Sequence, residues 1–190
     1  SALAFSASAA GSSNIVGYVK LSLARGYNLV ANPLNNTNPD GNTVGSLFGS
    51  VDCSVLRWNG NGFDTTDIIG GVGVVNGQNF ALAPGESVFV FVEAASSVTT
   101  VGEALVGTQT VTGVRGNNFV ASKIPLSGKL GADLGLTADG LSVSTWDGTK
   151  YVTYDYLEGV GYLPEDPTIG VGQGLLASTA NASGFTWRSE

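Results

Sequence analysis

The sequence predicts an all-β protein made of two tandem, internally duplicated modules of β-sandwich or barrel-like type, preceded by an extended N-terminal arm. Three observations lead to this prediction. The 190 residues include 28 glycines but only 12 % charged residues, about half the usual charged fraction. Such a composition disfavours helices and favours short strands joined by turns. A hairpin pattern containing tryptophan occurs twice, and further segments match in the same order across the two halves.

The duplicated hairpin is the clearest of these signals. Residues 55–63 and 143–151 each read as a strand, a tight turn and a second strand, with an Asn-Gly or Asp-Gly dipeptide that tolerates positive φ in the turn. Because the pattern recurs beside apolar strands, we expect its aromatic residues to anchor each hairpin in the core of its own module. Exposed tryptophans would instead serve as platforms for stacking sugars. The aromatic residues that flank the two turns are Trp58, Phe63, Trp146 and Tyr151.

Five further pairs of segments support a duplication. They lie at 16–17 and 106–107, 26–31 and 116–121, 44–49 and 130–135, 84–90 and 171–177, and 98–103 and 185–190. Six matches in order, at nearly constant spacing, indicate one module used twice. We therefore expect an arm at 1–13, a first module at 14–105 and a second at 106–190. No Pro/Ser-rich linker separates the modules, so we expect them to pack against each other.

The first module reads as a series of short strands. Alternating apolar and polar residues at 16–23 predict a half-buried strand. A second strand is expected at 27–31 and ends before Pro33, which cannot donate to a sheet. Residues 43–48 fit one helical turn, and the apolar run at 87–92 fits a central strand. Besides the hairpins, the remaining strands are expected at 98–101, 111–114, 119–121, 174–178 and 185–187.

The arm at residues 1–13 is apolar, uncharged and without a counterpart in the second half. Its small residues resemble the region around a signal-peptidase site, so we expect a secreted protein whose leader has been removed. Three interpretations of the arm are open: a strand of its own sheet, a leader remnant, or a strand donated to a neighbouring subunit. For subunit assembly the candidate interface residues, including one near the C-terminus, are Ala2, Leu3, Ala4, Phe5, Ala7 and Trp187.

The opening of the first module carries a resemblance. Residues 26–33 read Gly-Tyr-Asn-Leu-Val-Ala-Asn-Pro, and the Trp-turn-aromatic hairpin and an aliphatic strand after Pro-Gly follow. This order resembles a motif of secreted and surface-anchored bacterial β proteins. The likeness covers residues 16–105, whereas in the second module Asn117 replaces the aromatic and Ser122-Lys123 replaces Asn-Pro. The resemblance implies an extracellular surface protein, and no chemistry is attached to the motif.

The composition excludes several classes of chemistry. The chain has no histidine, which removes Ser-His-Asp and Cys-His catalysis and the commonest zinc ligand. Cys53 is the only cysteine, so we expect a small buried hydrophobe or, alternatively, an intermolecular bridge. A net charge of −7 without a basic stripe argues against nucleic acid and anionic membranes. No apolar stretch approaches the roughly 18 residues of a membrane span. We predict no catalytic residue, no cofactor and no metal site.

Two groups of oxygen-bearing side chains are candidates for other kinds of functional site. A pair of carboxylates could support glycoside hydrolysis, although a solvated acidic loop is the favoured interpretation of the candidates Asp155, Glu158, Glu165 and Asp166. Residues 36–42 space their oxygens as a calcium loop does, with Gly41 at the sixth position. The twelfth position is Leu47 rather than glutamate, so a plain turn is favoured.

These observations favour a non-catalytic structural subunit of an extracellular bacterial assembly, either a filament or a surface layer. Identical subunits would associate head to tail through β contacts, including donation of the N-terminal strand. The alternative is an extracellular carbohydrate- or surface-binding protein with glycans as partners. A hydrolase that uses the acidic loop of the second module is the third hypothesis.

Overall fold

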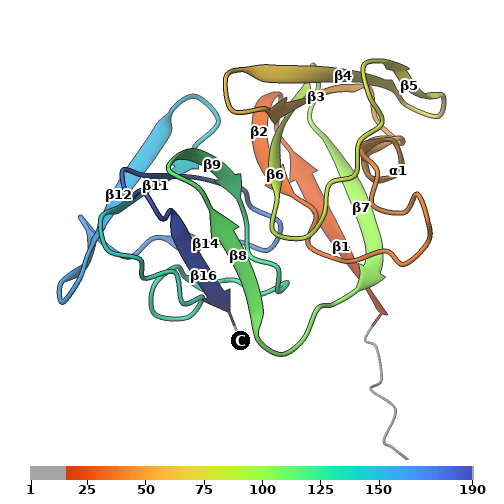
Figure 1. Cartoon of the computed structure of the whole chain (residues 1–190). Helices are drawn as coiled ribbons and strands as arrows, with labels where there is room; N and C mark the ends of the chain where they lie inside the picture. Colours follow the sequence, from red (N-terminus) through yellow and green to blue (C-terminus); the bar gives the residue numbers. More distant parts are fainter. Residues whose placement is uncertain (1–15, 190) are drawn as a thin grey trace, which may run out of the picture.

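The computed structural model describes residues 16–189 and has an all-β fold, with two groups of antiparallel sheets (Figure 1). This confirms the predicted fold class. The strands of the first group are β1 (Val16–Leu23), β2 (Gly26–Ala31), β3 (Cys53–Trp58), β4 (Phe63–Ile69), β5 (Gly73–Asn76), β6 (Ser87–Val92) and β7 (Ser96–Glu103). Those of the second are β8 (Gln109–Gly113), β9 (Gly116–Val120), β10 (Gly128–Lys129), β11 (Leu141–Trp146), β12 (Tyr151–Leu157), β13 (Gly161–Leu163), β14 (Thr168–Ile169), β15 (Leu175–Thr179) and β16 (Phe185–Ser189).

The two groups share one strand order. The first has a five-stranded sheet ordered β2-β6-β3-β4-β5, and the second has the corresponding sheet β9-β15-β11-β12-β13. A two-stranded ribbon accompanies each sheet, β1-β7 in the first group and β8-β16 in the second. The second group adds the short pair β10-β14. The predicted boundary between residues 105 and 106 lies in the connection from β7 to β8, and a shared strand order is what duplication of one module would produce.

The hairpins that the repeat predicts are present with matching registers. Trp58 lies opposite Phe63 across β3 and β4, and Trp146 lies opposite Tyr151 across β11 and β12. The predicted central strand is also confirmed, because β6 pairs with β2 on one side and β3 on the other.

The last strands align differently from the sequence match. That match equates Val98 with Phe185. In the ribbons, however, Val98 lies opposite Leu21, the third-last residue of β1, and Trp187 lies opposite Val111, the third-last residue of β8. Trp187 is therefore the structural counterpart of Val98. The connection before β16 spans 180–184, whereas that before β7 spans only 93–95. The longer loop shifts the register of the final strand and brings Trp187 to a buried position.

Each group buries its core between its ribbon and its five-stranded sheet. In the first group, α1 (Val44–Phe48) closes the core, and the side chain of Thr43 caps it by accepting from the Ser46 backbone nitrogen. The matched segment of the second group forms turns instead, and it supplies Leu130 and Leu134 to the core, followed by Leu136. No helix in the described part of the chain is long and apolar enough to cross a membrane.

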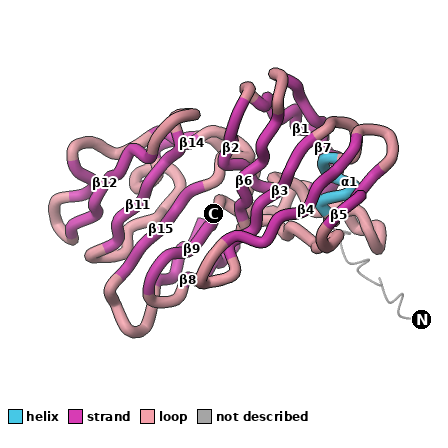
Figure 2. The backbone as a smooth tube through the Cα atoms, turned by 90° about the horizontal axis from the view of Figure 1, so that it is seen from above, coloured by secondary structure: helices cyan, strands magenta, loops and turns pink. Residues whose placement is uncertain are grey.

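The two five-stranded sheets lie side by side, with β5 and β12 toward opposite ends of the molecule (Figure 2). Corresponding atoms meet where the groups join. The backbone nitrogen of Ala31 donates to Gly172 O at 2.9 Å, and that of Ala121 donates to Gly85 O at 3.0 Å. Matching bridges join Val30 with Gln173 and Val120 with Glu86. The contact therefore has an approximate two-fold symmetry. Each group covers the inner edge of the other group's sheet, which is β2 in the first group and β9 in the second.

Candidate functional site

The residues proposed for subunit assembly divide into two sets. Trp187 lies in the described part of the chain, and its assignment to an interface is wrong. Its side chain is 1 % exposed, and its Nε1 donates to Leu134 O at 2.6 Å inside the second core. The reason is that β16 pairs with β8 and directs the indole between ribbon and sheet. The arm residues Ala2, Leu3, Ala4, Phe5 and Ala7 lie outside the described residues, so their role stays a prediction.

The four hairpin aromatics lie where the two groups meet, and not in either core. Phe63 is 41 % exposed and Tyr151 is 38 % exposed, so the interpretation of these residues as anchors inside their own modules is corrected. Trp58 and Trp146 are half-buried. Both hairpins direct their rings across the junction, which explains why they recur without filling a module core.

Phe89 of β6 is the central ring of this junction. Its ring centroid lies 5.3 Å from that of Trp146 and 6.2 Å from that of Tyr151, both in the second group. Phe119 of β9 makes the reverse contact, at 5.4 Å from Phe63. All three pairs are edge-to-face, which is a favoured aromatic geometry. Neither Phe89 nor Phe119 was identified from the sequence, because neither is repeated in the other module.

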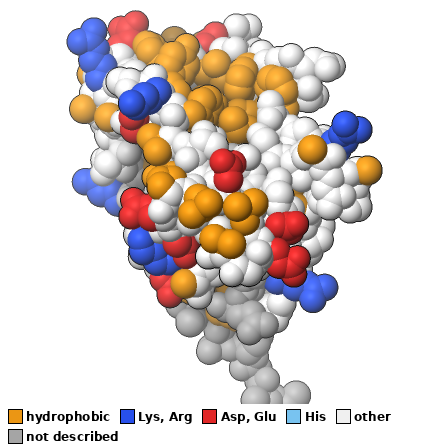
Figure 3. All heavy atoms as spheres, turned by 90° about the vertical axis from the view of Figure 1, so that its left-hand side faces the viewer, with side chains coloured by type: hydrophobic (Ala, Val, Ile, Leu, Met, Phe, Trp, Pro, Cys, Tyr) orange, Lys and Arg blue, Asp and Glu red, His pale blue; other side chains and the backbone are white. Residues whose placement is uncertain are grey.

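A hydrogen bond also crosses the junction. Trp146 Nε1 donates to the backbone oxygen of Tyr27 at 2.8 Å, which fixes the indole against the edge strand β2. Beside it lies a shallow cleft of about 290 Å³, which we call the junction cleft, lined by Tyr27, Leu56, Phe63, Phe89, Trp146 and Tyr151. Hydrophobic side chains gather near the top of the face drawn in Figure 3.

Two of the carboxylates considered for hydrolysis accept hydrogen bonds within the fold. Asp166 accepts from the backbone nitrogens of Gly131 and Ala132 at 2.9 and 3.0 Å, and Asp155 accepts from Ser142 Oγ at 2.5 Å. Tyr162 next to them is buried, and burial together with the nearby Asp166 raises its phenol pKa. These contacts give Asp155 and Asp166 roles in holding turns and strand pairs.

The loop at residues 36–42 bonds with itself and its surroundings. Asn42 Oδ1 accepts from Asn32 Nδ2 and from the Asn36 nitrogen, each at 2.9 Å. Asn42 Nδ2 donates to Asn35 Oδ1 at 3.0 Å. This network gives the Asn42 side chain a structural role in holding the loop. Across residues 16–189, no three His, Cys, Asp or Glu side chains gather closely enough to hold a metal ion.

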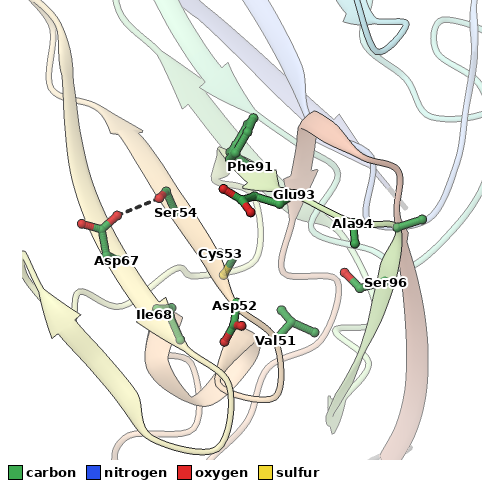
Figure 4. A pocket seen from close by; sticks show the side chains of 11 residues that line it. Val51, Asp52, Cys53, Ser54, Asp67, Ile68, Phe91, Glu93, Ala94 and Ser96 are labelled. Carbon is green, nitrogen blue, oxygen red and sulfur yellow. Dashed lines mark hydrogen bonds between the residues drawn. The ribbon is translucent and has the colours of Figure 1, made fainter.

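A hollow of about 550 Å³ lies beside Cys53 between β3 and the β6–β7 connection (Figure 4). Cys53 is buried, and desolvation, with Asp52 and Asp67 nearby, raises its thiol pKa to about 11. Asp67 is already bonded to Ser54 Oγ at 2.7 Å and Asn76 Nδ2 at 2.9 Å, which lowers its pKa. The thiol is therefore protonated and inert at neutral pH, as expected for a small buried hydrophobe.

The outer edges of the two sheets carry a second matched feature that the sequence analysis missed. Three aliphatic residues recur at one constant spacing, from 69 to 157, from 72 to 160 and from 75 to 163. We call them the edge triplets; they are Ile69, Val72 and Val75 in the first group, and Leu157, Val160 and Leu163 in the second. Their exposed fractions run from 43 % for Leu157 to 74 % for Val72.

Both triplets sit on the same local structure. The Val72 nitrogen donates to Ile69 O at 3.0 Å, and the Val160 nitrogen donates to Leu157 O at 3.0 Å, which closes the turns before β5 and β13. Gly71 and Gly159 take nearly equal positive φ values of 76° and 77°. Within the described residues, no strand pairs with the outer side of β5 or β13.

A scan against models of known protein families finds no match, and searches of curated proteins and of solved structures find no similar chain. The geometry of the junction and of the sheet edges is therefore the basis for assigning a function.

Proposed function

We propose that the protein is a non-catalytic structural subunit of an extracellular assembly, in which copies of the chain join end to end through the outer edges of their five-stranded sheets. The observation that carries this proposal is the pair of edge triplets. Both leave aliphatic side chains in water beside a sheet edge that no other described strand covers. Exposed apolar edges are sites at which sheets join.

The contrast between inner and outer edges supports this assignment. The inner strands β2 and β9 are covered, because each group bonds to the other through contacts such as Ala31 to Gly172. The outer strands β5 and β13 have no such cover in the described chain. Natural proteins usually protect a free edge with charge, yet β5 reads Gly-Val-Val-Asn and β13 reads Gly-Tyr-Leu.

The placement of the edges favours a polymer over a closed pair. β5 and β12, the neighbour of β13, lie toward opposite ends of the molecule (Figure 2). A contact between β5 of one copy and β13 of the next would leave one free edge at each end of the pair. Such a head-to-tail contact does not close, so it propagates.

We propose that the N-terminal arm, residues 1–13, makes a second contribution to the contact between copies. Its apolar residues, among them Leu3 and Phe5, are suited to adding a strand to the edge of a neighbouring copy. Secretion, which the small residues of the arm and the resemblance to surface proteins support, would place the assembly outside the cell.

The test uses the full chain, a variant with Val72→Lys and Val160→Lys together, and a chain lacking residues 1–12. Val114→Lys is the matched control, because Val114 is 71 % exposed but lies in the turn between β8 and β9. Electron microscopy and sedimentation should show polymers for the full chain and the control, and monomers for the double variant. Polymers that persist in the double variant would overturn the edge contact. Undiminished polymers after deletion of the arm would exclude strand donation.

A further inference from the structure

The junction cleft presents rings from both modules around one buried ring. Phe89, 7 % exposed, forms the floor, and Tyr27, Phe63 and Tyr151 remain 45 %, 41 % and 38 % exposed around it. Rings that only joined the two modules would be expected to bury their faces, since each aromatic side chain carries a large apolar area. The exposed ring surface indicates a further role.

We propose that the junction cleft is a binding site for a saccharide, with the ring of one sugar unit stacked on these aromatic side chains. The face of an aromatic ring carries partial negative charge, and the C–H bonds on one face of a pyranose carry partial positive charge. A sugar therefore packs flat on such a ring while its hydroxyl groups point outward. This inference is independent of the proposed assembly.

The dimensions favour a small ligand. The cleft measures about 290 Å³, close to the lower end of the range of roughly 300–1,000 Å³ for small-molecule sites. A stable protein partner would cover about 800 Å² on each side, for which six lining residues are too few. A ligand of one or two sugar rings is of the appropriate size.

Polar groups at the rim match the hydroxyl groups of a sugar. No described residue forms a hydrogen bond with the phenol oxygens of Tyr27 or Tyr151, so both are available to a ligand. A second hollow of about 350 Å³ adjoins the cleft and shares Tyr27 and Trp146 with it. Its lining is polar, and includes Lys20, Ser22, Asn28, Asp147 and Gln173. A saccharide longer than one unit would extend from the rings into this polar hollow, which an apolar ligand would avoid.

The aromatic lining of the cleft is not repeated at the matching positions of the second module. By the repeat, the counterparts of Tyr27, Leu56 and Phe89 in the second module are Asn117, Ser144 and Leu176. The approximate two-fold symmetry of the junction is therefore broken at the cleft itself. We expect one saccharide per chain.

The experiment is calorimetric titration of the full chain with a panel of soluble hexasaccharides: cello-, chito-, malto-, manno- and xylo-oligosaccharides. Tyr151→Ala and Tyr27→Ala remove one stacking ring each, and Tyr151→Phe keeps the ring but loses the hydroxyl. Tyr18→Ala is the matched control, because Tyr18 is 75 % exposed on β1 and does not line the cleft. Urea unfolding checks that every variant is folded.

We expect at least one member of the panel to bind with a stoichiometry of one. Its Kd should rise at least about tenfold in Tyr151→Ala and Tyr27→Ala, which corresponds to about 1.4 kcal/mol, and by a smaller factor in Tyr151→Phe. Tyr18→Ala should leave the Kd unchanged. Absence of binding by the whole panel would overturn the proposal, as would binding that the folded Tyr27→Ala and Tyr151→Ala variants retain in full.

Discussion

The backbone nitrogen of Ala31 lies 2.9 Å from the carbonyl oxygen of Gly172, and this hydrogen bond joins the edge strand of the first module to the segment that precedes β15 in the second. Its counterpart runs from Ala121 to Gly85 at 3.0 Å. The pair gives one chain the kind of reciprocal contact that a symmetric dimer has between two chains. These contacts cover the inner sheet edges, whereas no strand in residues 16–189 pairs with the outer edges.

Gly172 is expected to be intolerant of a side chain. Its φ is +73°, a region that L-residues rarely adopt, and a Cβ there would clash with the Leu21 side chain. We expect Gly172→Ala to lower the free energy of unfolding by about 2–4 kcal/mol, because backbone strain and overpacking add. Urea unfolding monitored by tryptophan fluorescence measures the loss.

Gly148→Ala is the matched control for this substitution. Gly148 has a φ of +102°, but a Cβ there would meet no atom within 4 Å. The control therefore carries only the backbone strain, about 1–2 kcal/mol. Equal losses in the two variants would contradict the close packing of Gly172 at the junction.

The buried position of Trp187 makes a prediction about stability. Trp187→Phe removes the Nε1–H group, leaves Leu134 O without that donor and creates a small cavity in the second core. We expect a loss of about 1–3 kcal/mol in the free energy of unfolding. Tyr18→Phe, at an exposed position, should change it by less than about 0.5 kcal/mol. A Trp187→Phe variant as stable as wild type would place the indole outside the core.

Cys53 should react slowly in the folded protein. Its pKa of about 11, against an ordinary 9.0, leaves the thiolate about 100-fold scarcer at pH 8 than in the unfolded chain. Modification by a disulfide reagent at pH 8 should therefore be at least about 100-fold slower in buffer than in concentrated urea. Equal rates would show that the thiol is not buried and that its pKa is not raised.

The same shift fixes the pH dependence of stability. The folded state holds the Cys53 proton more tightly than the unfolded state, so this contribution to stability is fully present below pH 9 and is lost as the pH rises toward 11. The difference in unfolding free energy between wild type and Cys53→Val isolates it from other titrating groups. The stability of the wild type relative to Cys53→Val should fall as the pH rises from 9 to 11. A difference that stays constant over this range would contradict the raised pKa.

The sequence predicted local structure well where residue type and spacing decide it. The two hairpins follow from their Asn-Gly and Asp-Gly turns, and β6 follows from its continuous apolar run. Repeat spacing also indicated two equivalent modules. These features depend on contacts between neighbouring strands, which patterns of apolar and polar residues encode directly.

The position of the rings could not be predicted in the same way. Trp58 and Trp146 read as core residues because a repeated aromatic beside apolar strands usually packs inward. Which face meets the other module depends on how two whole sheets dock, and no local pattern carries that information. Trp187 was misplaced because the longer loop at 180–184 moves the register of β16. The edge triplets were detectable from their constant spacing, but their exposure depends on which strands end the sheets.

The central claim is that β5 of one copy meets β13 of the next, and single-ended variants test it most directly. Val72→Lys leaves only the β13 edge usable, and Val160→Lys leaves only the β5 edge. By sedimentation velocity, the wild type should polymerise, each variant alone should be a monomer, and an equimolar mixture should form a dimer of twice the monomer mass. A wild type that stays monomeric at every concentration, or single variants that still polymerise, would contradict the account.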